Sequence, residues 1–462
     1  MAVIAFTQHR LGRTDGVSLE VDKWRVILER MGHTVHYISG NEDVPGGHCI
    51  PELYPFHPIT QKVIKNGTRK LSDYNSSLEL MAEVEAQAAR IKPQFLKHLR
   101  DLKVELLFPN NLVSVGYNLP GMQALVEAVD ELHAERGLRV TCHNHDFWWE
   151  DSGEVEPTCA EVAAHYRKYA PPIRPYIHHM VINRIAQAEL KRRTGQEARV
   201  VPNVFDFDRP AWTLDAYNAD FRNAIGVRET DLVFLQATRI LDRKGVELAI
   251  DLIAELQKPE NRVRLEAGPL YHGRSFGKRD RIVLVCAGYV EGIGLTGTYP
   301  EALKTKAAEM GVEVVWCATI VKHSRGAEEG RKIYSLWDSY AHADFVTYPS
   351  VWEGWGNQFI EAVFTKLPVC LFEYPVWTSD LAQCGFDVVS LGNQVSGTDK
   401  RNLVTVEPSI VRRAAGEVIA LLRDGKRRTQ VVEKNYAIAR ENFSLHALER
   451  IIRDVLEKQG IS

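Results

Sequence analysis

The chain has 462 residues with a formal net charge of −3, and its 45% hydrophobic and 25% charged residues are typical of a globular protein. The small net charge excludes a bulk basic field for nucleic acid or anionic lipid, and the sequence holds no apolar run of the roughly 20 residues that a membrane helix needs. Because so long a chain exceeds one ordinary core, we expect two domains of about 200 residues each.

The seven cysteines are dispersed and form no Cys-x-x-Cys pair. Such a set favours reduced thiols over a disulfide framework or a zinc site. The apolar start, Met1–Phe6, also lacks the basic leader and cleavage site of a signal peptide. We therefore expect a cytoplasmic protein.

The first forty residues read as strand, loop, helix and strand. Apolar Ala2–Phe6 precedes a polar loop, Thr7–Gly16, and Val17–Met31 carries apolar residues at helical spacing before a strand at Thr34–Ser39. This order predicts a parallel sheet, and ligands of such sheets bind at the carboxyl ends of the strands. The Thr7–Gly16 loop is therefore a candidate site wall.

Further strands and helices alternate along the rest of the first half and again in the second half. In the first half the expected segments are strands at 104–108, 138–142, 180–183 and 199–201 and helices at 78–102 and 120–136. After a polar link, Asp206–Asn223, they are strands at 232–236, 283–287, 312–317, 345–348 and 369–372 and helices at 246–257, 300–310, 333–341, 359–365, 410–423 and 430–459. The pattern predicts two parallel α/β domains with a ligand-binding cleft between them.

The segment Ser350–Ala362 follows an apolar strand and opens a helix. Its glycines, Gly354 and Gly356, let the backbone approach a ligand, and a helix N-terminus favours a diphosphate. Glu353 and Glu361 can accept hydrogen bonds from sugar hydroxyls. For either glutamate alone, an ordinary strand-to-helix turn is the favoured interpretation.

A second polar segment, Gln236–Gly245, also follows an apolar strand. Its cations at a strand end, Arg239 and Lys244, suit a diphosphate. The alternative is solvated loop charge, which is our interpretation of Arg243.

Arg239, Lys244-Gly245 and a Pro-Ser-x-x-Glu-Gly-x-Gly turn with a second glutamate eight positions on together resemble the donor site of glycosyltransferase family 4. The resemblance is strong from Val200 to Phe372 and weaker before it. It implies a GT-B fold, with two Rossmann-like domains facing across a cleft and transfer with retention at the anomeric carbon. The domains would span 1–205 on the acceptor side and 206–435 on the donor side, with a helix in 436–462 that returns to the first domain.

The resemblance also implies roles for individual residues. Arg239 and Lys244 would hold the diphosphate, and Glu353 with the amides of Gly354, Trp355, Gly356 and Asn357 would face the donor sugar. Glu361 would bind the ribose hydroxyls. The family commonly has Phe where this chain has Trp355, which keeps the site wall aromatic.

In the first half, a polar and aromatic segment, 141–150, follows a strand. The resemblance places a His-Asp pair near the reacting centre, which His145-Asp146 matches, and His143 is the competing candidate. A capped turn with buried aromatics explains any one of these residues about as well, and a zinc site is less favoured because no further ligands cluster.

The loop before the first helix resembles the family's Gly-rich loop, which closes over phosphate and acceptor. Gly16 would belong to the donor site, whereas the role of Asp15 is open because it stands where a glycine is common. Arg10 and Arg13 suit either an anionic acceptor or solvent, and Asn111 either lines the acceptor pocket or shapes a turn.

The resulting expectation is an enzyme that moves glucose or mannose from a UDP- or GDP-hexose to a hydroxyl of a small soluble acceptor, with glycerate glycosides as the favoured branch. Asp206-Phe207-Asp208 spells a metal motif of another glycosyltransferase fold, but we interpret it as structural. No cofactor or catalytic metal is then required, and Mg²⁺ would at most stimulate. A GT-B sugar phosphorylase and a non-catalytic sugar-nucleotide-binding module are the alternative functions. Nucleic acid is not an expected partner. The sequence leaves the oligomeric state open, with a homodimer as one option.

Overall fold

A computed structural model describes residues 1–13, 15–44, 46–150, 155–289 and 299–461. By its contacts the chain divides into two compact units. The first consists of Met1–Val204 and Leu445–Ser462, and the second of Phe205–Ser444. The domain boundaries expected above remain a prediction, which limited proteolysis can test.

The first unit is a parallel sheet with helices on both faces. The strands lie in the order β3 (Gly47–Cys49), β2 (Thr34–Ser39), β1 (Val3–Gln8), β4 (Leu106–Pro109), β5 (Arg139–Asn144), β6 (Ile177–Val181) and β7 (Ala198–Val200). The helices are α1 (Gly16–Arg30), α2 (Pro58–Thr68), α3 (Ser77–Asp101), α4 (Leu119–Arg136), α5 (Ala160–Tyr169), α6 (Arg184–Thr194) and α15 (Leu445–Lys458).

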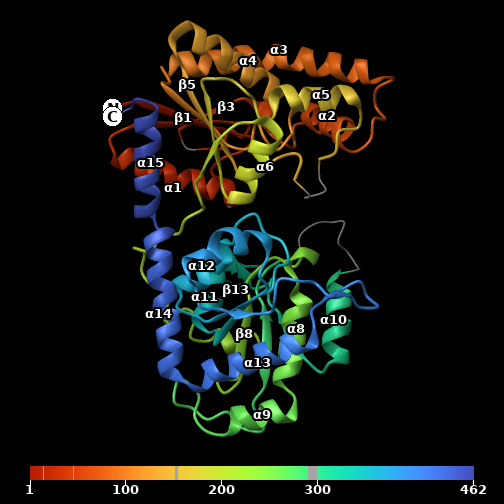
Figure 1. Cartoon of the computed structure of the whole chain (residues 1–462), viewed down its shortest axis with the longest axis vertical. Coiled ribbons are helices and arrows are strands. Elements are labelled where there is room, and N and C mark those ends of the chain that lie inside the picture. The colour runs from red at the N-terminus through yellow and green to blue at the C-terminus, as the bar shows by residue number, and fades with distance from the viewer. Residues whose placement is uncertain (14, 45, 151–154, 290–298, 462) are drawn as a thin grey trace. The chain divides into compact units, whose positions relative to one another are not determined.

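Side chains of β1 point alternately to the two faces of the sheet and contribute to a separate core on each face. Ala5 faces the core under α3 and α4, whereas Ile4 and Phe6 face the core under α1 and α15. The two helix pairs accordingly cover opposite faces of the sheet (Figure 1). Buried faces on both sides explain why the strands are short apolar runs.

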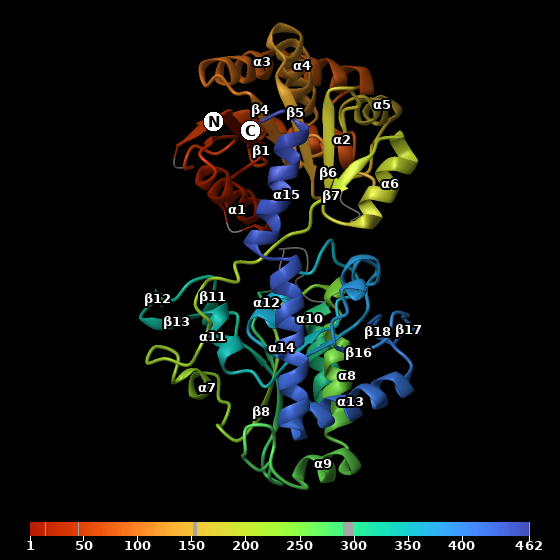
Figure 2. The same ribbon diagram turned by 60° about the vertical axis from the view of Figure 1, so that its left-hand side comes forward.

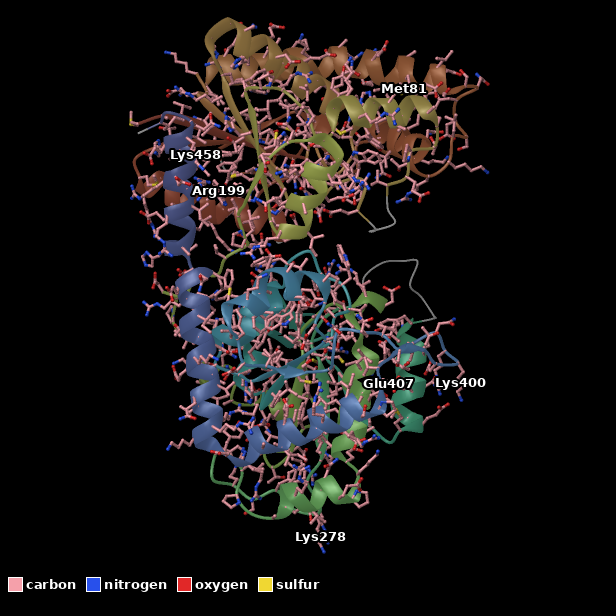
Figure 3. All side chains as sticks on the ribbon, viewed as in Figure 1. Met81, Arg199, Lys278, Lys400, Glu407 and Lys458 are labelled. Atoms are coloured by element: carbon pink, nitrogen blue, oxygen red, sulfur yellow. The ribbon has the colours of Figure 1, made fainter. Side chains whose placement is uncertain are left out.

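Helix α15 belongs to the first unit although it lies at the end of the chain. Its Leu448 and Ile452 are buried in the core that α1 also covers. Asp454 of α15 forms an ion pair with Arg199 of β7, which is labelled beside the helix in Figure 3, and a second one at 3.7 Å with Lys458 of the same helix. The helix thus joins the first unit through apolar burial and charge.

The second unit is also a parallel sheet with helices. The main sheet has the order β10 (Glu313–Trp316), β9 (Ile282–Cys286), β8 (Leu232–Gln236), β14 (Phe345–Tyr348), β15 (Val369–Leu371) and β16 (Val389–Ser390). The helices are α7 (Phe221–Ala224), α8 (Val246–Leu256), α9 (Pro259–Glu266), α10 (Tyr299–Glu309), α11 (Leu336–Ala341), α12 (Asn357–Phe364), α13 (Pro408–Arg423) and α14 (Gly425–Asn442). These two Rossmann-like sheets confirm the expected α/β class.

Two expected helices differ from the structure. The helix expected at 333–341 begins only at Leu336, because Ile333–Ser335 belongs to β13 (Arg331–Ser335), which pairs with β11 (Val321–Lys322) and β12 (Gly326–Glu328) in a small sheet beside α11 (Figure 2). The helix expected at 430–459 is interrupted between α14 and α15. A further hairpin joins β17 (Gly397–Thr398) to β18 (Val404–Thr405).

Candidate active site

The donor-side candidates follow two neighbouring strands of the second sheet. β8 pairs with β14 on one side and with β9 on the other, so the chain reverses its direction of winding between β8 and β14. Ligands of doubly wound sheets bind outside the carboxyl ends of strands at this reversal. Gln236–Gly245 and Ser350–Gly356 both begin there.

Lys244 and Glu353 form a buried ion pair at this edge. The Lys244 Nζ donates to Glu353 Oε1, and the two residues are only 3% and 7% exposed. Gly245 makes the approach of the two loops possible, because a Cβ at this position would lie 2.3 Å from the Pro349 carbonyl oxygen. The backbone N–H of Val351 also donates to the Arg243 carbonyl oxygen at 2.9 Å.

Arg243 is bound in the site, which corrects its interpretation as a solvated loop charge. Its Nη1 lies 3.2 Å from Glu353 Oε2, and its guanidinium stacks over the Trp352 ring at 5.3 Å. Glu353 therefore has a cation on each carboxylate oxygen. Burial alone would raise the pKa of Glu353, but the charges of Lys244 and Arg243 outweigh it and hold that pKa below its usual value.

Arg239 is half-buried and lies in the same loop as Lys244, directly after Thr238. A Cβ at Gly288 would lie 1.8 Å from the Thr238 carbonyl oxygen, so this loop packs tightly against the segment after β9. Burial lowers the pKa of Lys244, Glu353 opposes this, and the positive charges of Arg243 and Arg239 add to it. The three cations thus share one electrostatic environment.

The turn before α12 is locked by Tyr374. Gly356 has a φ of +143°, and a Cβ there would lie 2.3 Å from the Tyr374 hydroxyl oxygen. That hydroxyl donates to the Trp355 carbonyl oxygen at 2.7 Å, while the Trp355 indole packs on Phe443 with ring centroids 5.5 Å apart. The backbone from Gly354 to Asn357, where α12 begins, therefore has a defined path.

Glu361 lies within α12, on the second turn of the helix. It accepts a hydrogen bond of 3.2 Å from the buried Tyr340 hydroxyl. Tyr340 belongs to α11, so the packing of α11 on α12 holds the carboxylate in place. The structure thus brings Lys244, Glu353 and the start of α12 to one edge of the sheet.

The first unit has a similar edge. The chain reverses its direction of winding between β1 and β4, and β5 lies next to β4. The Arg10 loop follows β1, Asn111 follows β4, and His145 follows β5.

Asn111 holds the turn that contains His145 and Asp146. It has a φ of +55°, and its Oδ1 accepts hydrogen bonds from the backbone N–H groups of His145 at 2.7 Å and Asp146 at 3.1 Å. Its Nδ2 donates to Asp146 Oδ2 at 2.9 Å. The structure thus shows Asn111 as an organiser of the candidate His-Asp pair.

His143 and His145 lie against each other, with ring centroids 4.2 Å apart. The His145 Nε2 is 3.3 Å from Asn110 Oδ1, whereas the His143 ring packs against Trp24 at 5.4 Å. Burial lowers the pKa of His143 to about 3, and burial followed by the His143 charge lowers that of His145 well below its usual value. Both imidazoles are therefore neutral at pH 7.

Asp15 caps helix α1. Its Oδ1 accepts the backbone N–H of Ser18 at 3.1 Å, its Oδ2 accepts the Ser18 hydroxyl at 3.0 Å, and Gly16 is the first helical residue. The Arg10 guanidinium lies 3.5 Å from Asp15 Oδ2 and is about 39% exposed. Arg13 is instead paired with Asp43 at 2.7 Å.

His9 is a buried polar residue of the Thr7–Gly16 loop, which the sequence indicated as a candidate site wall without singling out this side chain. It directly follows β1 and is 4% exposed, and its ring centroid lies 6.2 Å from that of Tyr117 in the segment between β4 and α4. Its position directly after a strand of a parallel sheet is the signal that indicated this loop, whereas its burial is visible only in the folded chain.

Asp206 and Asp208 serve local structure. The Asp206 carboxylate accepts the backbone N–H of Asp208 at 3.0 Å, and Asp208 lies 3.5 Å from Arg440. Within the described ranges, three or more His, Cys, Asp or Glu side chains nowhere gather as a metal site would require. Among the helices that the structure describes, none has the length and apolar character to cross a membrane.

Two doubly wound sheets, with a lysine, an arginine and a glutamate at the winding reversal of the second, define a GT-B glycosyltransferase. A glycosyltransferase from Rickettsia africae has the same fold, with a TM-score of 0.59 at 11% identity over 99% of this chain and 98% of that one. HepE of Anabaena, solved with UDP and glucose, matches with a TM-score of 0.56 at 13% identity over 99% and 100% of the two chains. Sucrose-phosphate synthase from Thermosynechococcus elongatus matches with a TM-score of 0.57 at 13% identity over 99% of each chain.

The chain belongs to the family of two curated glycosyltransferases, the mannosylglucosylglycerate synthases of Petrotoga mobilis and Thermotoga maritima. It is 35% identical to the former over 421 residues, which cover 91% of this chain and 93% of the relative. It is 35% identical to the latter over 458 residues, which cover 98% and 99% of the two chains. No protein-family model matches the chain. The protein is thus a nucleotide-sugar-dependent hexosyltransferase, and neither the phosphorylase nor the non-catalytic module is favoured.

Proposed function

We propose that the protein transfers a mannosyl residue, with retention, from a nucleoside diphosphate mannose to a hydroxyl of glucosylglycerate. The observation that carries the proposal is the buried pair of Lys244 and Glu353, joined by the partly exposed Arg243, at the winding reversal of the second sheet. The names of the two relatives supply the sugar and the acceptor.

On the donor side, Lys244 and Arg239 neutralise the diphosphate. Lys244 has Glu353 as its partner, so a bound diphosphate competes with that carboxylate for the ammonium group. Glu353 then faces the sugar hydroxyls together with the amides of 354–357, and Glu361 binds the ribose hydroxyls from its position beside Tyr340. Uridine and guanosine are both candidates for the nucleoside.

At the reacting centre, the bond between the anomeric carbon and the diphosphate oxygen breaks, and the acceptor oxygen bonds to the same face of that carbon. The acceptor's proton passes to the departing diphosphate oxygen. The cations stabilise the charge that develops on this oxygen. We assign the neutral His145, rather than His143, to the donor sugar, because its Nε2 faces Asn110 while the His143 ring packs on Trp24.

On the acceptor side, Arg10 binds the glycerate carboxylate. Its guanidinium is partly exposed and rests on Asp15, which holds both Arg10 and the start of α1 in place. Asn111 and Asp146 shape the neighbouring wall.

The test is a transfer assay with GDP-mannose, UDP-mannose, GDP-glucose and UDP-glucose against glucosylglycerate, glycerate and glucose. We expect one mannosyl nucleotide with glucosylglycerate to give the fastest turnover, and proton NMR of the product to show the anomeric configuration of the donor. An inverted product, or transfer to glycerate alone, would contradict the proposal. Parallel reactions with EDTA or Mg²⁺ measure any metal stimulation, and inorganic phosphate with the product tests phosphorolysis.

A further inference from the structure

Several buried polar atoms gather near the carboxyl edge of the first sheet. Those without a hydrogen-bond partner in the described part of the chain include Thr7 Oγ1, His9 Nε2, Ser114 Oγ, His143 Nε2 and Asn144 Oδ1. They belong to β1, β5 and the segments that follow β1 and β4, which are neighbouring strands. Buried polar atoms are rarely left unpaired in native proteins, so this group requires hydrogen-bond partners from bound water or from a polar ligand.

Among these atoms, the hydrogen-bonding role of His9 Nε2 follows from the contacts of Gln8. The backbone N–H of His9 donates to Gln8 Oε1. A backbone N–H can only donate, so the Gln8 atom facing it is the carbonyl oxygen and not the amide nitrogen. The same oxygen lies 2.8 Å from His9 Nδ1. Nδ1 must therefore carry the proton of a neutral ring, and Nε2 has a free lone pair.

The burial of His9 keeps the ring neutral. Burial, and then the positive charge of Arg10, lower the pKa of His9 to about 4. At neutral pH, Nε2 is thus an acceptor and not a donor. It can bind a hydroxyl, whereas a carboxylate offers no proton to it.

We propose that His9 determines acceptor specificity, with Nε2 accepting a hydrogen bond from a hydroxyl of the acceptor's sugar ring and Gln8 holding the required tautomer. This inference rests on the proposed function. The next residue, Arg10, is the partly exposed cation assigned to the acceptor carboxylate. Adjacent residues therefore recognise the two ends of the acceptor, the sugar ring at buried His9 and the carboxylate at Arg10.

The test uses His9→Phe, which keeps a ring but removes the acceptor atom, and His9→Gln, whose amide oxygen can replace Nε2. We expect His9→Phe to lower kcat/KM for the acceptor about ten-fold or more, with the Kd of the donor nucleotide unchanged, and His9→Gln to recover most of this loss. His178→Gln, at an exposed position of β6, is the matched control. A purely structural role of His9 would lower the free energy of unfolding of the first unit in His9→Phe and would give no recovery of acceptor turnover in His9→Gln.

Singly deoxygenated acceptors give a second readout. Wild type should discriminate strongly against the analogue that lacks the bound hydroxyl, and His9→Phe should lose that discrimination. Nitrogen NMR should show a protonated Nδ1 in wild type and a changed tautomer population in Gln8→Leu. Unchanged acceptor kcat/KM in His9→Phe, with an active wild type, would overturn this inference alone. A wild type without transfer to any acceptor would instead overturn the proposed function.

Discussion

Lys244 and Glu353 form a buried ion pair although 109 positions separate them in the chain. Each lies in the loop after a different strand, and the two strands, β8 and β14, are neighbours in the sheet. The pair therefore forms only when both loops have their native positions. It links the stability of the second unit to the residues that we assign to the donor.

Removing Lys244 alone should harm both stability and turnover. Lys244→Met leaves Glu353 buried with only Arg243, and breaking a buried pair costs about 3–5 kcal/mol when no other partner remains. Because Arg243 stays, we expect a loss of about 2 kcal/mol in the free energy of unfolding and a loss of at least 100-fold in kcat. Denaturant unfolding and steady-state kinetics measure the two effects.

The double variant Lys244→Met/Glu353→Gln separates these effects. It should regain stability, because no uncompensated charge is buried, yet stay inactive. Lys304→Ala, which removes an exposed pair with Glu301, is the control and should change neither quantity. Substantial turnover in the double variant would contradict a role of the pair in donor binding.

Arg243→Met should shift the acid limb of the pH profile. The pKa of Glu353 is held low in the folded protein, so its contribution to stability is present above the unfolded pKa of about 4.3 and is lost as pH falls through the folded pKa. Removing the Arg243 charge raises the folded pKa, so acid inactivation should begin at a higher pH. Profiles of kcat/KM from pH 4 to 8 measure this, with exposed Arg453→Met as control. An identical acid limb would rule out Arg243 as a partner of Glu353 in the working enzyme.

Gly356→Ala should damage the donor turn through a direct clash. The added Cβ would meet the Tyr374 hydroxyl oxygen at 2.3 Å, so either the turn or Tyr374 must move. We expect a fall of ten-fold or more in kcat/KM for the donor. Gly137→Ala is the matched control, because Gly137 also has a positive φ but has nothing within 4 Å of its Cβ position. It should cost about 1 kcal/mol of stability with no change in kinetics. Equal kinetic losses in both variants would assign the effect to general destabilisation.

Buried neutral histidines should make the first unit sensitive to acid. Burial lowers the pKa of His165 to about 4, whereas an unfolded histidine has a pKa of about 6.5. Between these values the unfolded chain binds a proton that the native state does not, so the free energy of unfolding falls as pH decreases, by up to about 1.4 kcal/mol per pH unit. His165→Gln should reduce this slope between pH 6 and 5, and exposed His178→Gln should not. Urea unfolding at several pH values measures the slopes, and equal slopes in both variants would contradict the assignment.

The apolar pattern of the sequence determined the central strands. Leu232–Gln236 and Phe345–Tyr348 have the expected bounds, because a strand buried on both faces is a continuous apolar run that polar residues end abruptly. The charged loops after these strands were predictable for the same reason. The sequence thereby indicated the sheet edge that carries the donor candidates.

Short or interrupted elements were not predictable from that pattern. Ile333–Ser335 has apolar residues that fit a helix, but backbone pairing with two partner strands makes it part of β13. The expected helix at 430–459 stops at Phe443 and Ser444, where Phe205 donates to the Phe443 carbonyl oxygen at 2.8 Å. Pairing with residues far along the chain decides where these elements begin and end. Such pairing cannot be predicted from local periodicity.

The sequence by itself determined which residue types stand at the strand ends, since burial periodicity and loop polarity are local properties. Only the tertiary structure decided what each of them contacts. In the structure Arg243 pairs with Glu353, and Asp15 caps helix α1. The Nε2 atom of buried His9 has no hydrogen-bond partner among the described residues. The Arg243–Glu353 pair and the burial of His9 depend on segments that only the folded chain brings together.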